Sequence, residues 1–297
     1  MAILGEDGLQ CRRHAGKVAL LAADLARTPF PGQLGIAHTR WATHGKPSEV
    51  NAHPHRSGPI AVVHNGIIEN YRALRAELEA AGYQFHSETD TEVVAHLVHD
   101  LVRQGHDLAA ALAAALPRLE GAYALAVLSA AEPGTLVGAR RGSPLVVGIG
   151  IEESFLASDP LALRQVTDRF IYLEEGDQVS LTAASYRIRD RAGRTVAREI
   201  HTFSDPLDAA DRGGFRHFML KEIHEQPAVL AATLEGRVSA RQVLPEAFGT
   251  AAPDRFAAVE HVHVVACGTS YHAGLVARYW LEGWAGIPCQ GEVGSEN

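Results

Sequence analysis

The stretch from Gly35 to Tyr71 constrains the fold of this chain more than any other part of it. This short span holds Arg40, an Asn-Gly pair and five histidines, at positions 38, 44, 53, 55 and 64. Near its end, the apolar run PIAVV at residues 59–63 predicts a buried β-strand that leads directly into His64-Asn65-Gly66. So many functional groups beside one core strand indicate a binding site, which the rest of the chain supports.

The Asn-Gly step at residues 65 and 66 has two interpretations. Both residues tolerate positive φ, so the pair is typical of a plain turn after a strand. Alternatively, Gly66 lets a substrate approach the backbone, while its N–H and the Asn65 amide donate hydrogen bonds to a developing oxyanion. Taken alone, the dipeptide is more often a turn, and its neighbours decide between the two.

The segments HTRWATHGKPSEVNAHPH and VVHNGIIEN resemble the glutaminase domain of class II glutamine amidotransferases, the N-terminal-nucleophile type. Their sequences most resemble those of the glutamine–fructose-6-phosphate aminotransferase family. The resemblance implies that Arg40 holds the α-carboxylate of glutamine, a role that suits a planar guanidinium. It also implies that Asn65 and Gly66 form the oxyanion hole, and that the glutamine pocket is lined by Trp41, Thr43, His44 and His64.

The segment SETDTE at residues 87–92 predicts the start of a helix. Thr89 and Glu92 have the spacing of a capping box, and the apolar residues that follow supply a buried stripe. Asp90 would suit the first helical turn through the helix dipole alone. In the family that the chain resembles, the matching aspartate binds the α-amino group of the substrate, and we expect the same of Asp90.

In that family the mature chain begins with a cysteine whose thiol attacks the glutamine amide and whose α-amino group acts as the base. This chain begins Met1-Ala2, and its first cysteine, Cys11, lies inside a predicted strand without a free amine. Arg12 and Arg13 could lower the pKa of that thiol only modestly. The expectation is a fragment that lacks its nucleophile and does not hydrolyse glutamine by itself.

A pattern suited to anion binding lies near the end of the chain. Residues 260–266 predict a strand, Cys267-Gly268-Thr269-Ser270 a turn, and Tyr271 to Gly283 a helix. A strand, a small hydroxylated turn and a helix N-terminus can cradle an anion, although helix capping by Ser270 would explain the pattern equally simply. RHFMLKEIHEQP and CGTSYHAG resemble the start of a phosphosugar isomerase (SIS) domain, which implies that Thr269 and Ser270 contact fructose-6-phosphate.

The predicted fold is of the α+β class. By resemblance, residues 1–205 form a four-layer αββα glutaminase sandwich whose first strands are missing. A linker is expected at residues 206–215, where the composition turns polar and acidic, and residues 216–297 are expected to begin an incomplete α/β SIS-type domain. Helices are predicted at residues 16–27, 71–82, after 90, from 107 to 117 and from 216 to 234. Strands are predicted at residues 2–4, 9–12, 122–129, 135–139, 144–149, 155–157, 170–173, 178–181 and 186–189.

Composition sets wider limits. A length of 297 residues suits two domains, and a net charge of −8 argues against nucleic acid as a partner. No apolar run has membrane-spanning length, no signal peptide is visible, and three scattered cysteines indicate the reducing cytoplasm. The histidines show no recognised metal-ligand spacing, so neither a metal nor another cofactor is expected.

The function predicted for the complete protein is the glutamine-dependent conversion of fructose-6-phosphate to glucosamine-6-phosphate, by amide hydrolysis, ammonia transfer and isomerisation. Its partners would be these two substrates, and the resemblance implies a homodimer at full length. One alternative is another class II amidotransferase, such as amidophosphoribosyltransferase or asparagine synthetase. Another is a non-catalytic module that binds glutamine or a phosphosugar.

Overall fold

The computed structural model describes residues 1–40, 46–202, 214–235, 237–239, 242–248 and 252–294. The chain divides into two compact units, Met1–Asp211 and Arg212–Asn297. Most of the linker expected at residues 206–215 lies outside the described residues.

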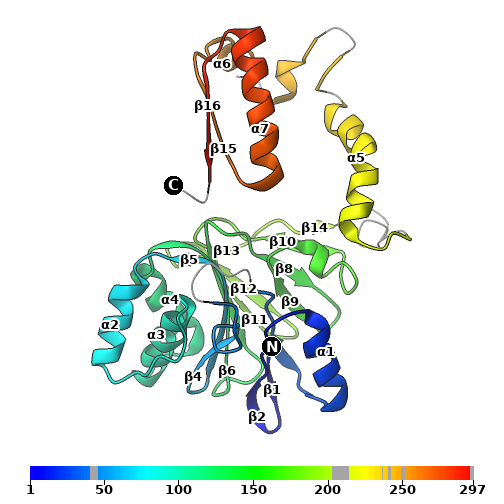
Figure 1. The fold of residues 1–297 in the computed structure, drawn as a ribbon. Helices are drawn as coiled ribbons and strands as arrows, with labels where there is room; N and C mark the ends of the chain where they lie inside the picture. Colours follow the sequence, from blue (N-terminus) through cyan, green and yellow to red (C-terminus); the bar gives the residue numbers. More distant parts are fainter. Residues whose placement is uncertain (41–45, 203–213, 236, 240–241, 249–251, 295–297) are drawn as a thin grey trace. The chain divides into compact units, whose positions relative to one another are not determined.

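The first unit contains most of the strands and four of the α-helices (Figure 1). Its helices are α1 (Val18–Arg27), α2 (Tyr71–Ala80), α3 (Thr91–Arg103) and α4 (Leu108–Ala115). Its strands are β1 (Ala2–Gly5), β2 (Gly8–Cys11), β3 (Leu34–Ile36), β4 (His55–Ser57), β5 (Ile60–Ile68), β6 (Gly121–Ser129), β7 (Leu136–Arg141), β8 (Val146–Ile149), β9 (Ser154–Ala157), β10 (Arg169–Tyr172), β11 (Gln178–Leu181), β12 (Tyr186–Arg189), β13 (Thr195–Val196) and β14 (His201–Thr202).

The strands form three antiparallel sheets. The largest has the order β13-β12-β11-β7-β6-β5-β4, a second has the order β14-β10-β8-β9, and a third has the order β2-β1-β3. The β5 and β6 strands are the longest and pair along their whole length, from Ile60 opposite Ser129 to Ile68 opposite Gly121. The large sheet is therefore the scaffold on which residues 60–68 are held.

Two hydrophobic cores lie on opposite faces of the large sheet. One joins α2, α3 and α4 to the sheet and includes Leu97, Leu112 and Leu125, all fully buried. The other packs the sheet against strands of the two smaller sheets and includes Val147 and Ile171. Figure 1 shows this helix–sheet–sheet layering, with α2 to α4 on one side and β8, β9 and β10 on the other. The predicted α+β class is confirmed.

The start of α3 differs from the capping box expected at Thr89 and Glu92. The Glu92 carboxylate instead accepts hydrogen bonds from the backbone N–H and the hydroxyl of Ser87, at 2.7 and 2.6 Å. Asp90 occupies the N-cap position, but its carboxylate makes no cap bond to its own helix. The Glu92 carboxylate therefore binds the loop just before the helix, because Asp90 and not Thr89 is the N-cap residue.

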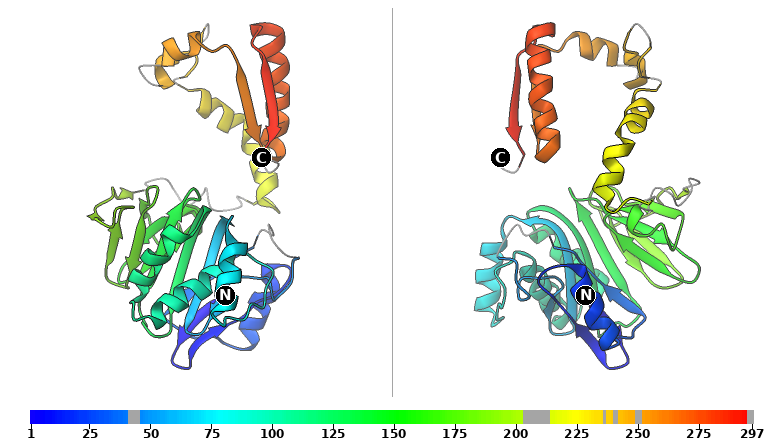
Figure 2. Two further views of the ribbon diagram at one scale, coloured as in Figure 1. Left: turned by 90° about the vertical axis from the view of Figure 1, so that its left-hand side faces the viewer. Right: turned by 45° about the vertical axis from the view of Figure 1, so that its right-hand side comes forward.

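The second unit holds α5 (Phe218–Leu234), α6 (Ala252–Ala257), β15 (Val262–Ala266), α7 (Gly268–Trp280) and β16 (Cys289–Val293). The β15 and β16 strands are parallel and α7 connects them, so these elements form a β-α-β unit (Figure 2). The helix begins at Gly268 and not at the predicted Tyr271. Its N-cap is Cys267, so the alternative that Ser270 caps this helix is wrong.

Candidate functional site

A pocket of about 250 Å³ opens beside the carboxyl-terminal half of β5. Its walls come from the loop after β3, the segment before β4, the strand β5 and the beginning of α3. The lining residues are His38, Arg40, His53, His64, Asn65, Gly66, Ile67, Asp90 and Thr91. Five of the residues predicted to bind or stabilise the substrate, Arg40, His64, Asn65, Gly66 and Asp90, thus face one small space.

The Asn-Gly pair lies inside β5 and not in a turn, so the turn interpretation is wrong. Asn65 is paired with Ala124 and Gly66 with Tyr123 on β6. Gly66 has φ +129°, and a Cβ built on it would lie only 2.0 Å from the carbonyl oxygen of Ala122. Only glycine fits this conformation and this close approach, and it leaves the backbone of the strand open toward the pocket.

Charged groups of opposite sign contribute to the same pocket. The guanidinium of Arg40 also lies 3.4 Å from the carbonyl oxygen of Lys46. The Asp90 carboxylate is buried, and its Oδ2 accepts a hydrogen bond of 2.8 Å from the backbone N–H of Ile68. This bond ties the start of α3 to the end of β5 and fixes the acid at the pocket wall.

A chain of hydrogen bonds fixes the imidazoles behind these groups. The backbone N–H of His64 donates to His53 Nδ1, so His53 carries its proton on Nε2 and donates it to Thr91 Oγ1. The Thr91 hydroxyl also lies 3.0 Å from His64 Nδ1, so it links the two rings. Burial, with the charges of neighbouring groups, strongly lowers the pKa of His53, so this ring is neutral at physiological pH. The His53 ring therefore has one defined tautomer.

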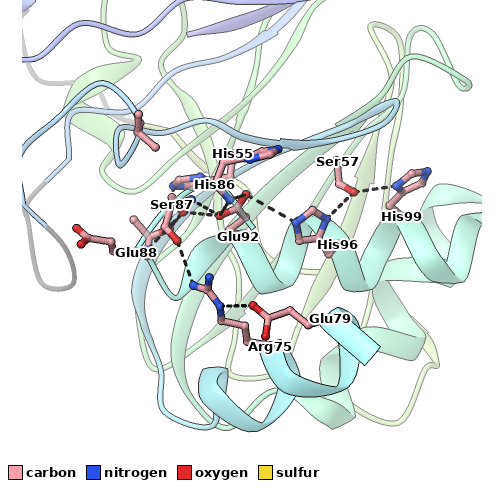
Figure 3. A network of polar contacts seen from close by, with 12 residues as sticks. His55, Ser57, Arg75, Glu79, His86, Ser87, Glu88, Glu92, His96 and His99 are labelled. Atoms are coloured by element: carbon pink, nitrogen blue, oxygen red, sulfur yellow. Dashed lines mark hydrogen bonds and ion pairs between the residues drawn. The ribbon is translucent and has the colours of Figure 1, made fainter. Parts of the chain in front are cut away.

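A second polar network lies between β4 and α3 (Figure 3). The Glu92 carboxylate can only accept, so the Ser87 hydroxyl donates to it, the Thr89 hydroxyl donates to Ser87, and His55 Nε2 donates to Thr89. On the other side of Glu92, His96 lies 3.7 Å from the carboxylate and 2.8 Å from the Ser57 hydroxyl. The network therefore returns to β4, on which both His55 and Ser57 lie.

Burial and hydrogen bonding shift the titration of this network in opposite ways. Burial would raise the pKa of Glu92, but the nearby His96 ring and hydrogen bonds from Ser87 and from the backbone N–H of His86 outweigh it and hold the pKa at about 2. Burial lowers the pKa of His55 to about 4, although the nearby Glu92 charge opposes the shift. At neutral pH the network contains an ionised acid and a neutral His55.

The remaining predicted site residues are not among the described residues that line the pocket. Trp41, Thr43 and His44 lie outside the described residues. Thr269 and Ser270 are exposed in the first turn of α7, within the second unit. The sequence predicted no role for four lining residues, His38, His53, Ile67 and Thr91. The density of histidines was the available signal for the first two, and Thr91 was visible only as part of the SETDTE segment.

The three cysteines are unpaired thiols, and none lines the pocket among the residues that the structure describes. Cys11 is the last residue of β2 and is half-buried, and its sulfur lies 3.9 Å from the carbonyl oxygen of Pro54. Within the described ranges, no cluster of three or more histidine, cysteine or acidic side chains has the arrangement of a metal site. In the same ranges, every helix is too short or too polar to span a bilayer.

Comparison with known proteins shows what this chain is similar to. Residues 38–165 match the family model described as a glutamine amidotransferase domain. Over its whole length the chain is a homologue of glutamine–fructose-6-phosphate aminotransferases (isomerizing). It is 59% identical to those of Pseudomonas putida and Pseudomonas aeruginosa and 52% identical to that of Escherichia coli K12.

Each of these alignments covers 100% of this chain and 49% of the relative, so the chain spans about half the length of the curated relatives it matches. A solved structure, the C-terminal domain of glucosamine-fructose-6-phosphate aminotransferase from Francisella tularensis, aligns with 29% of this chain and 24% of that chain. Their identity is 38%, and the TM-score of 0.26 is too low to bear on the fold.

Proposed function

We propose that the pocket binds L-glutamine, with Arg40 at its α-carboxylate and Asp90 at its α-ammonium group. One observation carries this proposal: a cation, an anion and the Asn65-Gly66 backbone line the same space of about 250 Å³. A free amino acid carries opposite charges on adjacent groups, so a guanidinium and a carboxylate that line one pocket can recognise it. The Asn65 amide and Gly66 then lie where they can donate to the side-chain carbonyl.

In the complete protein, we propose, glutamine bound here is hydrolysed and its ammonia serves the conversion of fructose-6-phosphate to glucosamine-6-phosphate. The support is the identity of 52–59% to aminotransferases named for that reaction. Attack on the amide carbon requires a nucleophile, and the oxyanion that forms requires donors held in place beforehand. The lining residues in the described part of the chain supply such donors but no thiol, so this chain is expected to bind glutamine without turning it over.

The rest of the assignment extends the same proposal. Residues 1–205 would be the glutaminase and residues 216–297 the beginning of the phosphosugar isomerase domain, joined by a linker at 206–215. Thr269 and Ser270, exposed at the start of α7, would contact the phosphate of fructose-6-phosphate, because a helix N-terminus attracts anions. A homodimer working in the cytoplasm is the expected form of the complete protein.

Titration calorimetry with L-glutamine tests the pocket directly. Asp90→Asn keeps an oxygen that can accept the Ile68 N–H but removes the charge, and Arg40→Lys removes the planar fork. Each variant is expected to weaken binding by roughly tenfold or more, because a charge-assisted hydrogen bond contributes about 1.5–3 kcal/mol. Arg56→Lys is the matched control, since Arg56 bonds Leu9 and Gly58 away from the pocket.

Wild-type affinity retained by both pocket variants would refute the binding mode, and absence of any glutamine binding would refute the proposed function. Glutamate release by the unmodified chain is expected to equal background and to be unchanged in Cys11→Ala. Turnover that disappears in Cys11→Ala would show instead that Cys11 is the nucleophile.

A further inference from the structure

His38 makes the shortest contact with the Asn65 side chain. Its Nε2 lies 2.6 Å from Asn65 Oδ1. The two residues come from separate elements, the loop after β3 and the strand β5, and both line the pocket. An asparagine amide can present either its oxygen or its NH₂ group to a ligand, and the partner of the other end decides which one.

The hydrogen on His38 can be placed from its surroundings. The other ring nitrogen, Nδ1, is buried and has no hydrogen-bond partner among the described residues. If Asn65 were turned over, its NH₂ would donate to His38 Nε2, and the His38 proton would move to Nδ1. A buried N–H would then lack an acceptor, which is rarer in folded proteins than an unused lone pair. The proton therefore belongs on Nε2, which donates to Asn65.

The His38 ring is itself held in place. It stacks on His53, with ring centroids 4.4 Å apart and an angle of 24° between the planes. His53 is fixed through both nitrogens, by the backbone N–H of His64 and by Thr91. A neutral ring of defined tautomer thus supports a second ring, and burial also lowers the pKa of His38 and keeps it neutral.

We propose that His38 is a positioning residue whose Nε2–H holds the Asn65 side-chain oxygen, so that the Asn65 amide presents its NH₂ group to the pocket. Its role rests on the proposed glutamine site, where that NH₂ group would donate to the side-chain carbonyl of the substrate. Without His38 the amide could rotate and place an oxygen against that carbonyl, which is repulsive. The effect is confined to ligands that carry a side-chain carbonyl.

Two substitutions in the full 297-residue chain separate positioning from packing. His38→Gln keeps an N–H donor close to the place of Nε2, and His38→Leu keeps bulk without a donor. Calorimetry with L-glutamine is expected to show roughly tenfold weaker binding for His38→Leu and binding within about threefold of wild type for His38→Gln. L-Norvaline, which has the same α-groups and no side-chain amide, is expected to bind all three chains equally.

Equal binding of glutamine by wild type and His38→Leu would overturn the proposal, as would an equal loss of glutamine and norvaline. If His38→Leu does not fold, as judged by circular dichroism, His38→Asn replaces it. Its donor is too short to reach Asn65, and it is expected to show the same selective loss for glutamine.

The ring tautomer gives a readout that does not depend on glutamine binding. Long-range ¹H–¹⁵N correlation spectra are expected to show His38 protonated on Nε2 and bare on Nδ1. If wild type fails to bind glutamine, the proposed function fails, and this spectrum alone decides the positioning role. A proton on Nδ1 would overturn it, and a proton on Nε2 would support it.

Discussion

Gly66 shows how one residue can serve both the fold and the site. Its φ of +129° lies in a region that side chains avoid, and its α-carbon faces the backbone of Ala122 on the neighbouring strand. A residue without a side chain lets β5 continue through this point while the strand backbone stays accessible at the pocket. The pairing of β5 with β6 by itself requires glycine at this position, whatever the pocket binds.

Gly66→Ala is predicted to destabilise the first unit by about 3 kcal/mol or more, because strain at positive φ and an overpacked contact act together. Gly82→Ala is the matched control. Gly82 has φ +91° but nothing within 4 Å of its Cβ position, so only strain of about 1 kcal/mol is expected. Urea unfolding measures both variants. Equal losses in the two would show that the contact with Ala122 relaxes at no cost.

Some of the residues that line the pocket could be predicted from the sequence. The resemblance singled out Arg40, Asn65 and Asp90, and the structure places all three at one pocket, while their roles remain proposals. The contacts that hold them were not predictable. His38 meets Asn65 across 27 positions of sequence, and Asp90 meets Ile68 across 22. Such distances depend on how β5 and α3 pack, which no local pattern encodes.

The α3 helix contributes to two polar sites. Its N-cap residue Asp90 and its first residue Thr91 line the pocket, whereas Glu92 and His96 belong to the network with β4. The predicted apolar stripe is therefore only part of the buried surface of α3. The helix also buries Glu92 and His96, which contact Ser87 and Ser57 (Figure 3). Movement of α3 against β4 would disturb both the network and the pocket wall.

The His55 network predicts a dependence of stability on pH. The pKa of His55 is about 4 in the folded chain and about 6.5 in the unfolded chain. Between pH 6.5 and pH 4, His55 is therefore protonated in the unfolded state and neutral in the folded state. The free energy of unfolding therefore falls as the pH falls from 6.5 to 4. The loss from this residue is about 2 kcal/mol between pH 7 and pH 5. His53, whose pKa is also lowered, adds to it.

His55→Gln is expected to reduce the loss of unfolding free energy between pH 7 and pH 5 by about 2 kcal/mol, because the variant lacks the imidazole that is protonated only in the unfolded state. His106→Gln, at an exposed histidine between α3 and α4, should leave the decline unchanged. Urea unfolding followed through NMR cross-peaks of the large sheet measures both chains at each pH. The same decline in His55→Gln and wild type would contradict the lowered pKa.

The predicted bounds of helices and strands were accurate where neighbouring residues determine them and inaccurate where contacts with distant residues do. The β11 and β12 strands fall at the predicted residues, because short runs with apolar residues are bounded by turn residues, with Gly176 before β11 and Gly193 after β12. The β5 strand runs five residues past the predicted Val63, because pairing with β6 overrides the turn preference of Asn-Gly. The start of α7 also differs from the prediction, because Gly268, with φ +57°, takes a left-handed conformation that glycine tolerates and stands at the first position of the helix.

At the scale of the whole molecule, the pocket and both cores lie within one unit. Every lining residue falls between positions 38 and 91, and the members of the two cores fall between Ala2 and Val196. None of these groups comes from Arg212–Asn297. Within the described residues, the proposed glutamine site therefore has all its walls in the part of the chain that carries its own hydrophobic core.

A chain of residues 1–202 is therefore predicted to fold and to bind L-glutamine with a dissociation constant within about twofold of the 297-residue chain, since neither core loses a residue. A chain of residues 1–150 is the matched control. It keeps every lining residue but lacks Ile171, Val179 and Ile188 of the second core, and burial of such side chains contributes about 1.5–3 kcal/mol each. It is expected to unfold and to bind nothing. Dispersion of the amide NMR spectrum and calorimetry measure both chains. If residues 1–202 folded but bound glutamine tenfold more weakly, the second unit would have to contribute to the site.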